Sequence, residues 1–244
     1  MSSNAVANLT LPLLSGNAAW AAQMNATNST FLPTLAEAQA PPVVWIGCAD
    51  SRVPESVITN QLPGQIFTTR NIGNQFHTND DSAQAVVEYG IGHLNASNVV
   101  VVGHTNCGGV KAAYAAGAPT ATDSSSHAHA TEPESSDTCS RRRSYFARSA
   151  SENSTEEAEE ANDPLNNFLA PLIDLRRALP PNATVLDLTV ANVRAGVIHV
   201  VNSTTIQDAW AAGREVCVHG WLYDLASGLI QDLGFTTCSD STVN

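Results

Sequence analysis

The sequence predicts an α/β protein built on a mostly parallel β-sheet flanked by helices. Short apolar segments bounded by Gly, Pro or Asn alternate with longer segments of helical length. The apolar segments are nearly continuous, which is typical of parallel strands buried on both faces and joined by helical crossovers. With 244 residues, 43% of them hydrophobic, the chain can bury a large core. We therefore expect a single domain over residues 1–244.

The elements follow one another in order along the chain. The expected strands are residues 41–47, 65–70, 97–104 and 215–222. The expected helices are residues 80–94, 109–117, 163–179 and 185–201, the last of which also suits a strand because it is rich in Val. Asp80 or Asp81, and Asp163 before Pro164, are suitable helix starts.

Two regions depart from this alternation. Residues 1–35, approximately, are expected to form an N-terminal arm. Residues 118–162, approximately, are rich in Ser, Thr, Glu and Ala and carry clusters of opposite charge. This composition indicates an exposed low-complexity insertion rather than a second domain.

The charge and hydropathy of the chain exclude two classes of partner. The net charge is −12, so the summed field repels polyanions, and we expect no binding to nucleic acid. No apolar run approaches the roughly 20 residues that span a bilayer, so we expect no membrane span. Small neutral or anionic ligands remain compatible with this charge if a local cation receives them.

Three residues at the ends of two expected strands suggest a metal site. Cys48 ends the first apolar segment, and His104 and Cys107 follow the third with two residues between them. Thiolate and imidazole are preferred zinc ligands, and three protein ligands leave a fourth position open for catalysis. A buried cysteine with a core histidine is the alternative for an isolated pair of this kind.

The flanking motifs resemble those of the β-class carbonic anhydrases. They are "CADSR" (48–52), "RNIGN" (70–74) and "GHTNCGGVKAA" (103–113), in this order, and "HGWLYDLASGLI" (219–230) is similar to the C-terminal strand and hairpin of that family. The resemblance runs from about residue 15 to 235, apart from the insertion. It implies a zinc enzyme that interconverts CO2 and bicarbonate, with an α/β fold that forms a homodimer or a higher even oligomer.

The same resemblance implies a role for each matching residue. The zinc ligands would be Cys48, His104 and Cys107, and the acid–arginine dyad would be Asp50 and Arg52. Positions that match the family's substrate pocket, partly across a dimer interface, are Gln39, Phe67 and Gly108.

The residue types fit this chemistry. A zinc-bound hydroxide that attacks CO2 must direct a lone pair at carbon, and a carboxylate such as Asp50 accepts its hydrogen and so orients it. Arg52 keeps that carboxylate charged and away from the metal. If Asp50 instead bound zinc, the site would be closed, and the sequence leaves this question open. An ion pair at a strand end is the simpler reading of the dyad, and the proton-shuttle candidates, unranked, are His77, His93, His199 and His219.

Two other functions remain open from the sequence. One is a zinc-stabilised binding module without catalysis, in which Asp50 supplies a fourth ligand. The other is a zinc hydrolase that acts on another small substrate, such as an ester or carbon disulfide.

The cysteines and glycosylation motifs bear on localisation. The chain has five cysteines and a single lysine. We expect a secreted glycoprotein that already lacks its signal peptide, and otherwise a cytoplasmic protein. In a secreted chain we expect a disulfide between Cys139 and Cys238, with Cys217 buried and reduced. The seven Asn-x-Ser/Thr motifs are at Asn8, Asn25, Asn28, Asn95, Asn153, Asn182 and Asn202.

Overall fold

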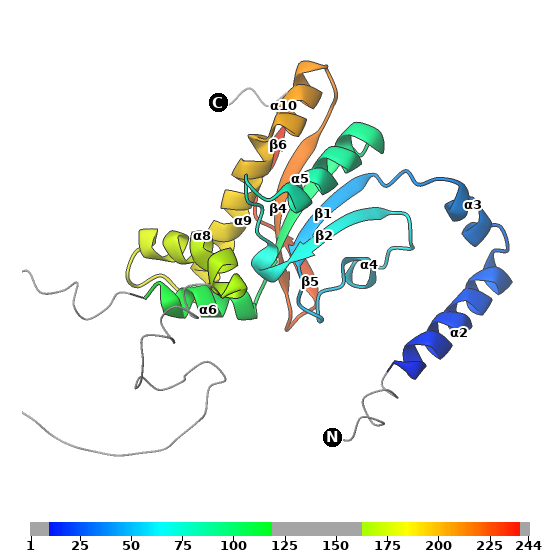
Figure 1. The fold of residues 1–244 in the computed structure, drawn as a ribbon, viewed down its shortest axis with the longest axis horizontal. Coiled ribbons are helices and arrows are strands. Elements are labelled where there is room, and N and C mark those ends of the chain that lie inside the picture. Colours follow the sequence, from blue (N-terminus) through cyan, green and yellow to red (C-terminus); the bar gives the residue numbers. More distant parts are fainter. Residues whose placement is uncertain (1–9, 119–162, 240–244) are drawn as a thin grey trace, which may run out of the picture.

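The computed structural model describes residues 10–118 and 163–239. Its centre is a sheet with the strand order β2-β1-β3-β4-β5 (Figure 1). The strands up to β4 are parallel, and β5 and β6 run antiparallel to β4, so the predicted mostly parallel sheet and its four strands are confirmed. The strands are β1 (Val43–Cys48), β2 (Ile66–Asn71), β3 (Asn98–His104), β4 (Cys217–Asp224), β5 (Leu229–Asp232) and β6 (Thr237–Cys238).

The continuous apolar strands serve two cores because successive side chains point to opposite faces of the sheet. In β1, Val44 and Ile46 belong to one core and Trp45 to the other. In β3, Val99 and Val101 alternate with valines of the second core in the same way. Each fully buried aliphatic side chain contributes about 2 kcal/mol to folding, so this pattern fixes the register of the sheet.

Helices cover both faces of the sheet. The first core lies under α5 (Asp81–Glu88), the π-helix η2 (Tyr89–His93), α9 (Val185–Val201) and α10 (Thr204–Ala211). The second core lies under α6 (Gly108–Ala116) and α8 (Pro164–Ala178), with the short α4 (Glu55–Ile58) packed against it. The four predicted helices are confirmed, and the segment predicted as one helix over 80–94 is α5 continued by η2.

The helix starts follow the predicted capping. The Asp80 carboxylate accepts from two backbone N–H groups at the start of α5, and Asp163 accepts from one at the start of α8. Thr184 and Asp187 form a reciprocal capping box at the start of α9, which settles that segment as a helix rather than a strand.

The N-terminal arm consists of α2 (Leu11–Thr27) and α3 (Phe31–Glu37), and neither helix has a buried residue. Figure 1 shows α2 standing apart from the sheet. Several of its apolar side chains are exposed, among them Leu13, Leu14 and Trp20. The predicted insertion over 118–162 lies outside the described residues except for Ala118.

A disulfide joins Cys217 to Cys238. The predicted pairing of Cys139 with Cys238 is therefore wrong, as is the prediction that Cys217 stays reduced. Cys217 begins β4 and lies directly opposite Cys238 in β6, with their Cα atoms 4.1 Å apart. A two-residue strand gives too weak a sequence pattern to predict this pairing, and Cys139 lies outside the described residues.

Among residues 10–118 and 163–239, no single helix is long and apolar enough to cross a bilayer. Only α9 and α10 taken together meet those criteria, and they are bent by 52° at the break between them.

Candidate metal centre and active site

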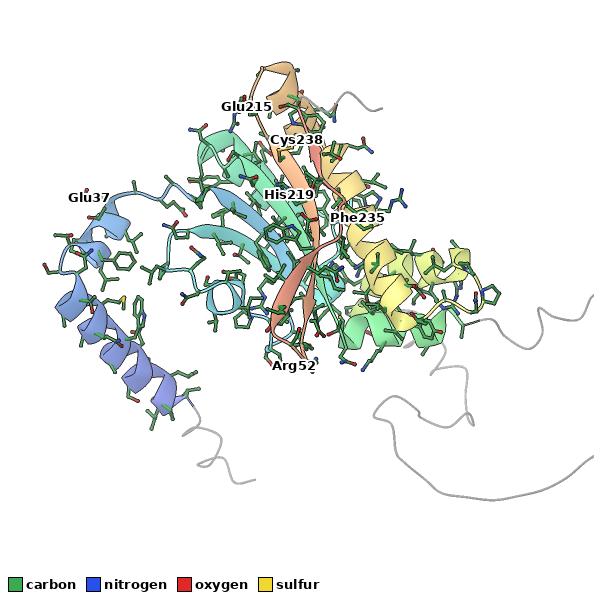
Figure 2. The ribbon with its side chains drawn as sticks, turned by 180° about the vertical axis from the view of Figure 1, so that it is seen from behind. Glu37, Arg52, Glu215, His219, Phe235 and Cys238 are labelled. Atoms are coloured by element: carbon green, nitrogen blue, oxygen red, sulfur yellow. A yellow bond between two sulfur atoms is a disulfide. The ribbon has the colours of Figure 1, made fainter. Side chains whose placement is uncertain are left out.

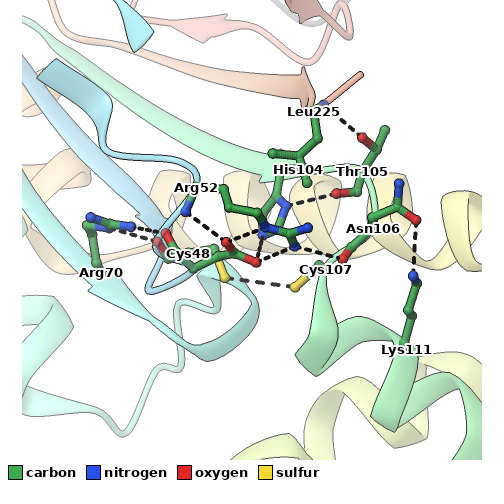
Figure 3. Close-up of polar contacts among 10 residues, drawn as sticks. Cys48, Arg52, Arg70, His104, Thr105, Asn106, Cys107, Lys111 and Leu225 are labelled. Atoms are coloured by element: carbon green, nitrogen blue, oxygen red, sulfur yellow. Dashed lines mark hydrogen bonds and ion pairs between the residues drawn. The ribbon is translucent and has the colours of Figure 1, made fainter. Parts of the chain in front are cut away.

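The site forms where two neighbouring parallel strands end. Cys48 is the last residue of β1 and His104 the last of β3, and these strands pair in parallel. Cys107 follows at the N-cap of α6, after a short turn. Because parallel strands present their carboxyl ends at one edge, three ligand-type side chains from distant parts of the sequence meet there (Figure 3).

The three side chains fit a zinc ion. All are buried, and their Sγ and ring nitrogen atoms lie within 4.8 Å of one another. The Sγ atoms of Cys48 and Cys107 are 3.8 Å apart. Two sulfurs bound at about 2.3 Å to a tetrahedral zinc lie about 3.8 Å apart, which is the separation found here. Among the described residues, no other group of His, Cys, Asp and Glu side chains meets the geometric criteria for a metal site.

The His104 ring is held in the tautomer that a metal requires. Its Nδ1 lies 2.9 Å from the Thr105 carbonyl oxygen, and a carbonyl only accepts, so Nδ1 carries the hydrogen. Nε2 is then a free lone pair, buried and without a hydrogen-bond partner. Thr105 itself is fixed, because its hydroxyl donates to Asp224 and accepts from the Leu225 N–H. The contacts of Thr105 therefore orient the His104 ring, as hydrogen bonds to the second ring nitrogen of a metal-binding histidine do in known metal sites.

The two thiols strongly influence each other's protonation. The hydrogen bond from Cys107 lowers the pKa of Cys48 well below its usual value, and the same bond raises the pKa of Cys107 above its own. Burial raises the pKa of both thiols. Backbone N–H groups favour the thiolate form, from Gly73 toward Cys48 and from Gly109 and Val110 toward Cys107. The pair therefore has one ready thiolate, and a divalent cation is suited to stabilise the second.

Asp50 pairs with Arg52. The Arg52 Nε donates to Asp50 Oδ1 at 2.9 Å and an Arg52 terminal nitrogen donates to Oδ2 at 2.7 Å, which is a bidentate pair. The Arg52 backbone N–H also donates to Oδ1. These bonds hold the pKa of Asp50 well below its ordinary range. Asp50 Oδ2 remains 3.9 Å from His104 Nε2, so the carboxylate lies beside the ligand cluster.

Arg70 fixes the turn that carries Cys48 and Asp50. Arg70 lies near the end of β2, opposite Gly47 in β1. Its guanidinium donates to the backbone carbonyls of both Cys48 and Asp50. A weaker ion pair links it to Glu55 at 3.9 Å. Arg70 therefore has a structural role as a hydrogen-bond donor to this turn.

A second set of contacts joins the two ligand-bearing loops. Arg52 donates to the backbone carbonyl of Asn106, between the two ligands of the other loop. Lys111, the single lysine of the chain, donates from α6 to the Asn106 side chain at 3.0 Å. Asn106 has φ = 58°, a left-handed conformation that an asparagine tolerates better than most residues. Sequence reasoning assigned no role to Asn106 or Lys111, because their contacts depend on the packing of the two loops.

Gly108 is the first residue of α6, directly after Cys107 and one residue before the predicted helix start. A Cβ on Gly108 would meet no atom within 4 Å, whereas a Cβ on Gly109 would lie 2.5 Å from the Ile72 side chain. Packing against Ile72 therefore requires a glycine at position 109. Position 108 has open space around it, next to Cys107 in the sequence.

Gln39 and Phe67 lie away from Cys48 within one chain. Gln39 is exposed and precedes β1, so it lies at the opposite end of the strand from Cys48. Five strand steps separate Val43 from Cys48, which is roughly 16 Å. Phe67 pairs with Val44 near the same end and stacks on Tyr89, with ring centroids 5.8 Å apart.

The four histidines considered for proton transfer have other contacts. His77 and His199 border a cavity of about 340 Å³ between α8 and α9. The His93 ring packs at a tilt against Tyr89, and His219 lies between Asn98 and Thr236. None of these contacts is with the Cys–His–Cys cluster.

Comparisons with known proteins agree with this geometry. A sequence model of the family described as carbonic anhydrase matches residues 43–230. A carbonic anhydrase of Emericella nidulans is 30% identical over 229 residues, which cover 91% of this chain and 82% of that protein. A carbonic anhydrase of Saccharomyces cerevisiae is 41% identical over 100 residues, which cover 41% of this chain and 45% of that protein.

Two solved structures are similar over almost the whole chain. One comes from work on two tetrameric β-carbonic anhydrases of the filamentous ascomycete Sordaria macrospora. It has a TM-score of 0.70 and 31% identity and covers 94% of this chain and 99% of that chain. The other is a Coccomyxa β-carbonic anhydrase in complex with acetazolamide. It has a TM-score of 0.70 and 27% identity and covers 92% of this chain and 86% of that chain.

Proposed function

Because this chain belongs to the β-class of the carbonic anhydrase family, we propose that Cys48, His104 and Cys107 hold the zinc ion with which it works. The protein is a carbonic anhydrase that interconverts CO2 and bicarbonate with release of a proton. The observation that carries this conclusion is the buried Cys–His–Cys cluster beside a carboxylate held by an arginine.

A zinc ion held by these residues would acidify water and so supply a nucleophile near neutral pH. Asp50 orients that nucleophile. Its Oδ2 is the carboxylate oxygen placed near His104 Nε2, and an ionised carboxylate only accepts hydrogen bonds. Asp50 would therefore accept a hydrogen bond from the nucleophile and leave a lone pair directed at the carbon of CO2.

Arg52 keeps Asp50 in this role by two means. Its charge maintains the Asp50 carboxylate in the ionised form, which is the form that only accepts hydrogen bonds. Its two donors occupy the carboxylate at fixed angles, so Asp50 is held away from the ligand position it would otherwise take. Arg70 supports the same turn from its backbone side.

We propose that Gln39 and Phe67 line the substrate pocket of a partner subunit and that the enzyme is a homodimer or a higher even oligomer. Both residues lie toward the end of the sheet away from Cys48 of their own chain. β2 is the outer strand of the described sheet, and the apolar side chains of α2 are exposed. A second copy is the partner that would cover both surfaces.

Sedimentation velocity tests the assembly. We expect a species of at least twice the chain mass of 25.6 kDa. A double variant, Leu13→Asp with Leu14→Asp, should weaken the association and lower CO2 hydration with it. A parent chain that sediments as an active monomer would contradict the proposal.

We also propose that the chain is secreted and glycosylated. The Cys217–Cys238 disulfide persists in an oxidising compartment. The asparagine is exposed in each of the five motifs that fall within the described residues, at Asn25, Asn28, Asn95, Asn182 and Asn202. Fractionation of the native source, with glycosidase treatment of the recovered protein, tests this. Recovery from the cytoplasm with no change in mobility would contradict it.

Stopped-flow CO2 hydration across pH 6 to 9, together with zinc analysis, tests the activity itself. We expect one zinc per chain and turnover that Asp50→Ala greatly reduces. Full zinc loading without CO2 turnover at any of these pH values would exclude the assignment and favour a non-catalytic module. Faster turnover of a small ester or carbon disulfide than of CO2 would favour a hydrolase.

A further inference from the structure

α9 carries a polar residue inside its apolar face. Asn192 is 6% exposed and is followed in the same helix by the buried Val193, Gly196 and Val197. A buried amide is costly unless its groups are hydrogen-bonded. Its Nδ2 donates to the backbone carbonyl of Gly73 at 2.7 Å, a contact between residues 119 positions apart.

Gly73 belongs to the turn that directly follows β2. The turn is the 3-10 helix η1 (Ile72–Asn74), and Gly73 has φ = 75°, a left-handed conformation that glycine adopts readily. The turn is packed directly against the start of α6, since a Cβ on Gly109 would lie 2.5 Å from Ile72 and 3.6 Å from the Gly73 nitrogen.

The Gly73 backbone links Asn192 to a metal ligand. Cys48 lies opposite Asn71, two residues before Gly73, and the Gly73 N–H is among the backbone groups that favour the Cys48 thiolate. The Gly73 carbonyl accepts from Asn192. Only the two backbone torsions of Gly73 separate these groups, and glycine has more freedom at both torsions than any other residue. A hydrogen bond to the carbonyl therefore limits this freedom and narrows the range of directions open to the N–H.

We propose that Asn192 is a positioning residue for Cys48 that acts through Gly73. The inference rests on the proposed function, because it requires Cys48 to hold the metal. A hydrogen bond to a ligating thiolate withdraws electron density from the sulfur, and outer-layer contacts of this kind change metal affinity by about 10–100-fold. Asn192 thus tunes the strength with which Cys48 binds the ion.

Asn192→Leu tests the inference, because leucine keeps the volume and removes the donor. We expect the dissociation constant for zinc, measured by chelator competition, to rise about tenfold, because the loss of a fixed Cys48 position outweighs the gain in electron density on its sulfur. In the cobalt-substituted protein we expect the sulfur-to-cobalt charge-transfer band to move to longer wavelength, because a thiolate without its N–H bond is a stronger donor. Asn192→Ser, which also loses the contact, should move both quantities in the same direction.

Thr189→Val is the matched control. Thr189 is buried in the same helix and faces the same sheet, and its hydroxyl donates to the Val185 carbonyl of its own helix. It should leave the zinc affinity and the cobalt band unchanged.

The possible outcomes separate this inference from the proposed function. Asn192 variants with the parental zinc affinity and cobalt band would overturn it, as would loss of folding in both variants, since Asn192 would then be purely structural. A parent chain that binds neither metal would overturn the proposed function and this inference together. Parental metal binding with an altered band only in the Asn192 variants supports both.

Discussion

Replacing Cys238 with serine should destabilise the protein without impairing catalysis. The Cys217–Cys238 disulfide closes a loop with a sequence separation of 21 residues. Loop closure of that length removes about 11 cal/mol/K of entropy from the unfolded chain, or about 3 kcal/mol at 25 °C. For a chain of this size, that loss lowers the midpoint of thermal unfolding by about 6–12 °C.

Activity should be retained because the bond is remote from the site. Figure 2 shows Cys238 and Arg52 toward opposite ends of the sheet. The Cys238→Ser variant should therefore hydrate CO2 at the parental rate at 25 °C and lose that activity at a lower temperature than the parent.

Calorimetry and circular dichroism of the zinc-loaded protein provide the assay. The parent in reductant should show the same loss of thermal stability as the variant, and reductant should not affect the variant further. Thr237→Ser, which changes β6 beside the bond and keeps the cysteine, is the matched control. A variant that unfolds within about 2 °C of the parent would refute the reasoning, because the unfolded chain would then gain no measurable freedom.

Four further outcomes are expected. Cys48→Ala should fold and carry less than about one tenth of the parental zinc in elemental analysis, and full zinc occupancy would contradict its role as a ligand. Asp50→Asn should keep its zinc and lose about a hundredfold or more in kcat by stopped flow, and an unchanged kcat would remove Asp50 from the mechanism. Arg52→Lys should lower kcat by about tenfold, because an ammonium does not reproduce the bidentate pair, and parental turnover would show that charge alone suffices. The Thr184 backbone N–H lowers the pKa of Asp187, so this carboxylate stabilises the fold above its unfolded pKa of about 4, and that stabilisation is lost as pH falls through the lower folded value. Asp187→Asn should then be less stable than the parent at pH 7 and equal to it near pH 2 in urea unfolding, whereas a gap that does not change with pH would sink this account.

The sequence predicted the central sheet because its strands have an unambiguous pattern. Continuous apolar segments such as 97–104 suit strands covered on both faces, and their carboxyl ends place Cys48 and His104 together. The cluster of Cys48, His104 and Cys107 could be predicted for the same reason, because a parallel topology brings the ends of two neighbouring strands to one edge of the sheet.

The remaining features depend on packing that a local pattern does not encode. β6 is two residues long, so its pairing with β4, and the disulfide with it, required the fold. Asn192 lies within an apolar helix, and nothing near it in sequence indicates that its amide reaches Gly73. Whether Asp50 binds zinc or pairs with Arg52 depends on side-chain torsions. The motif "CADSR" is compatible with both.

The N-terminal arm would report on the proposed assembly of subunits. A helix of 17 residues with none of them buried has little to stabilise it in a dilute chain, because isolated helices of this length are marginal in water. If the arm gains its support from a second copy, part of the far-ultraviolet helix signal belongs to the oligomer rather than to the subunit. Dilution should then reduce helicity and activity over the same concentration range.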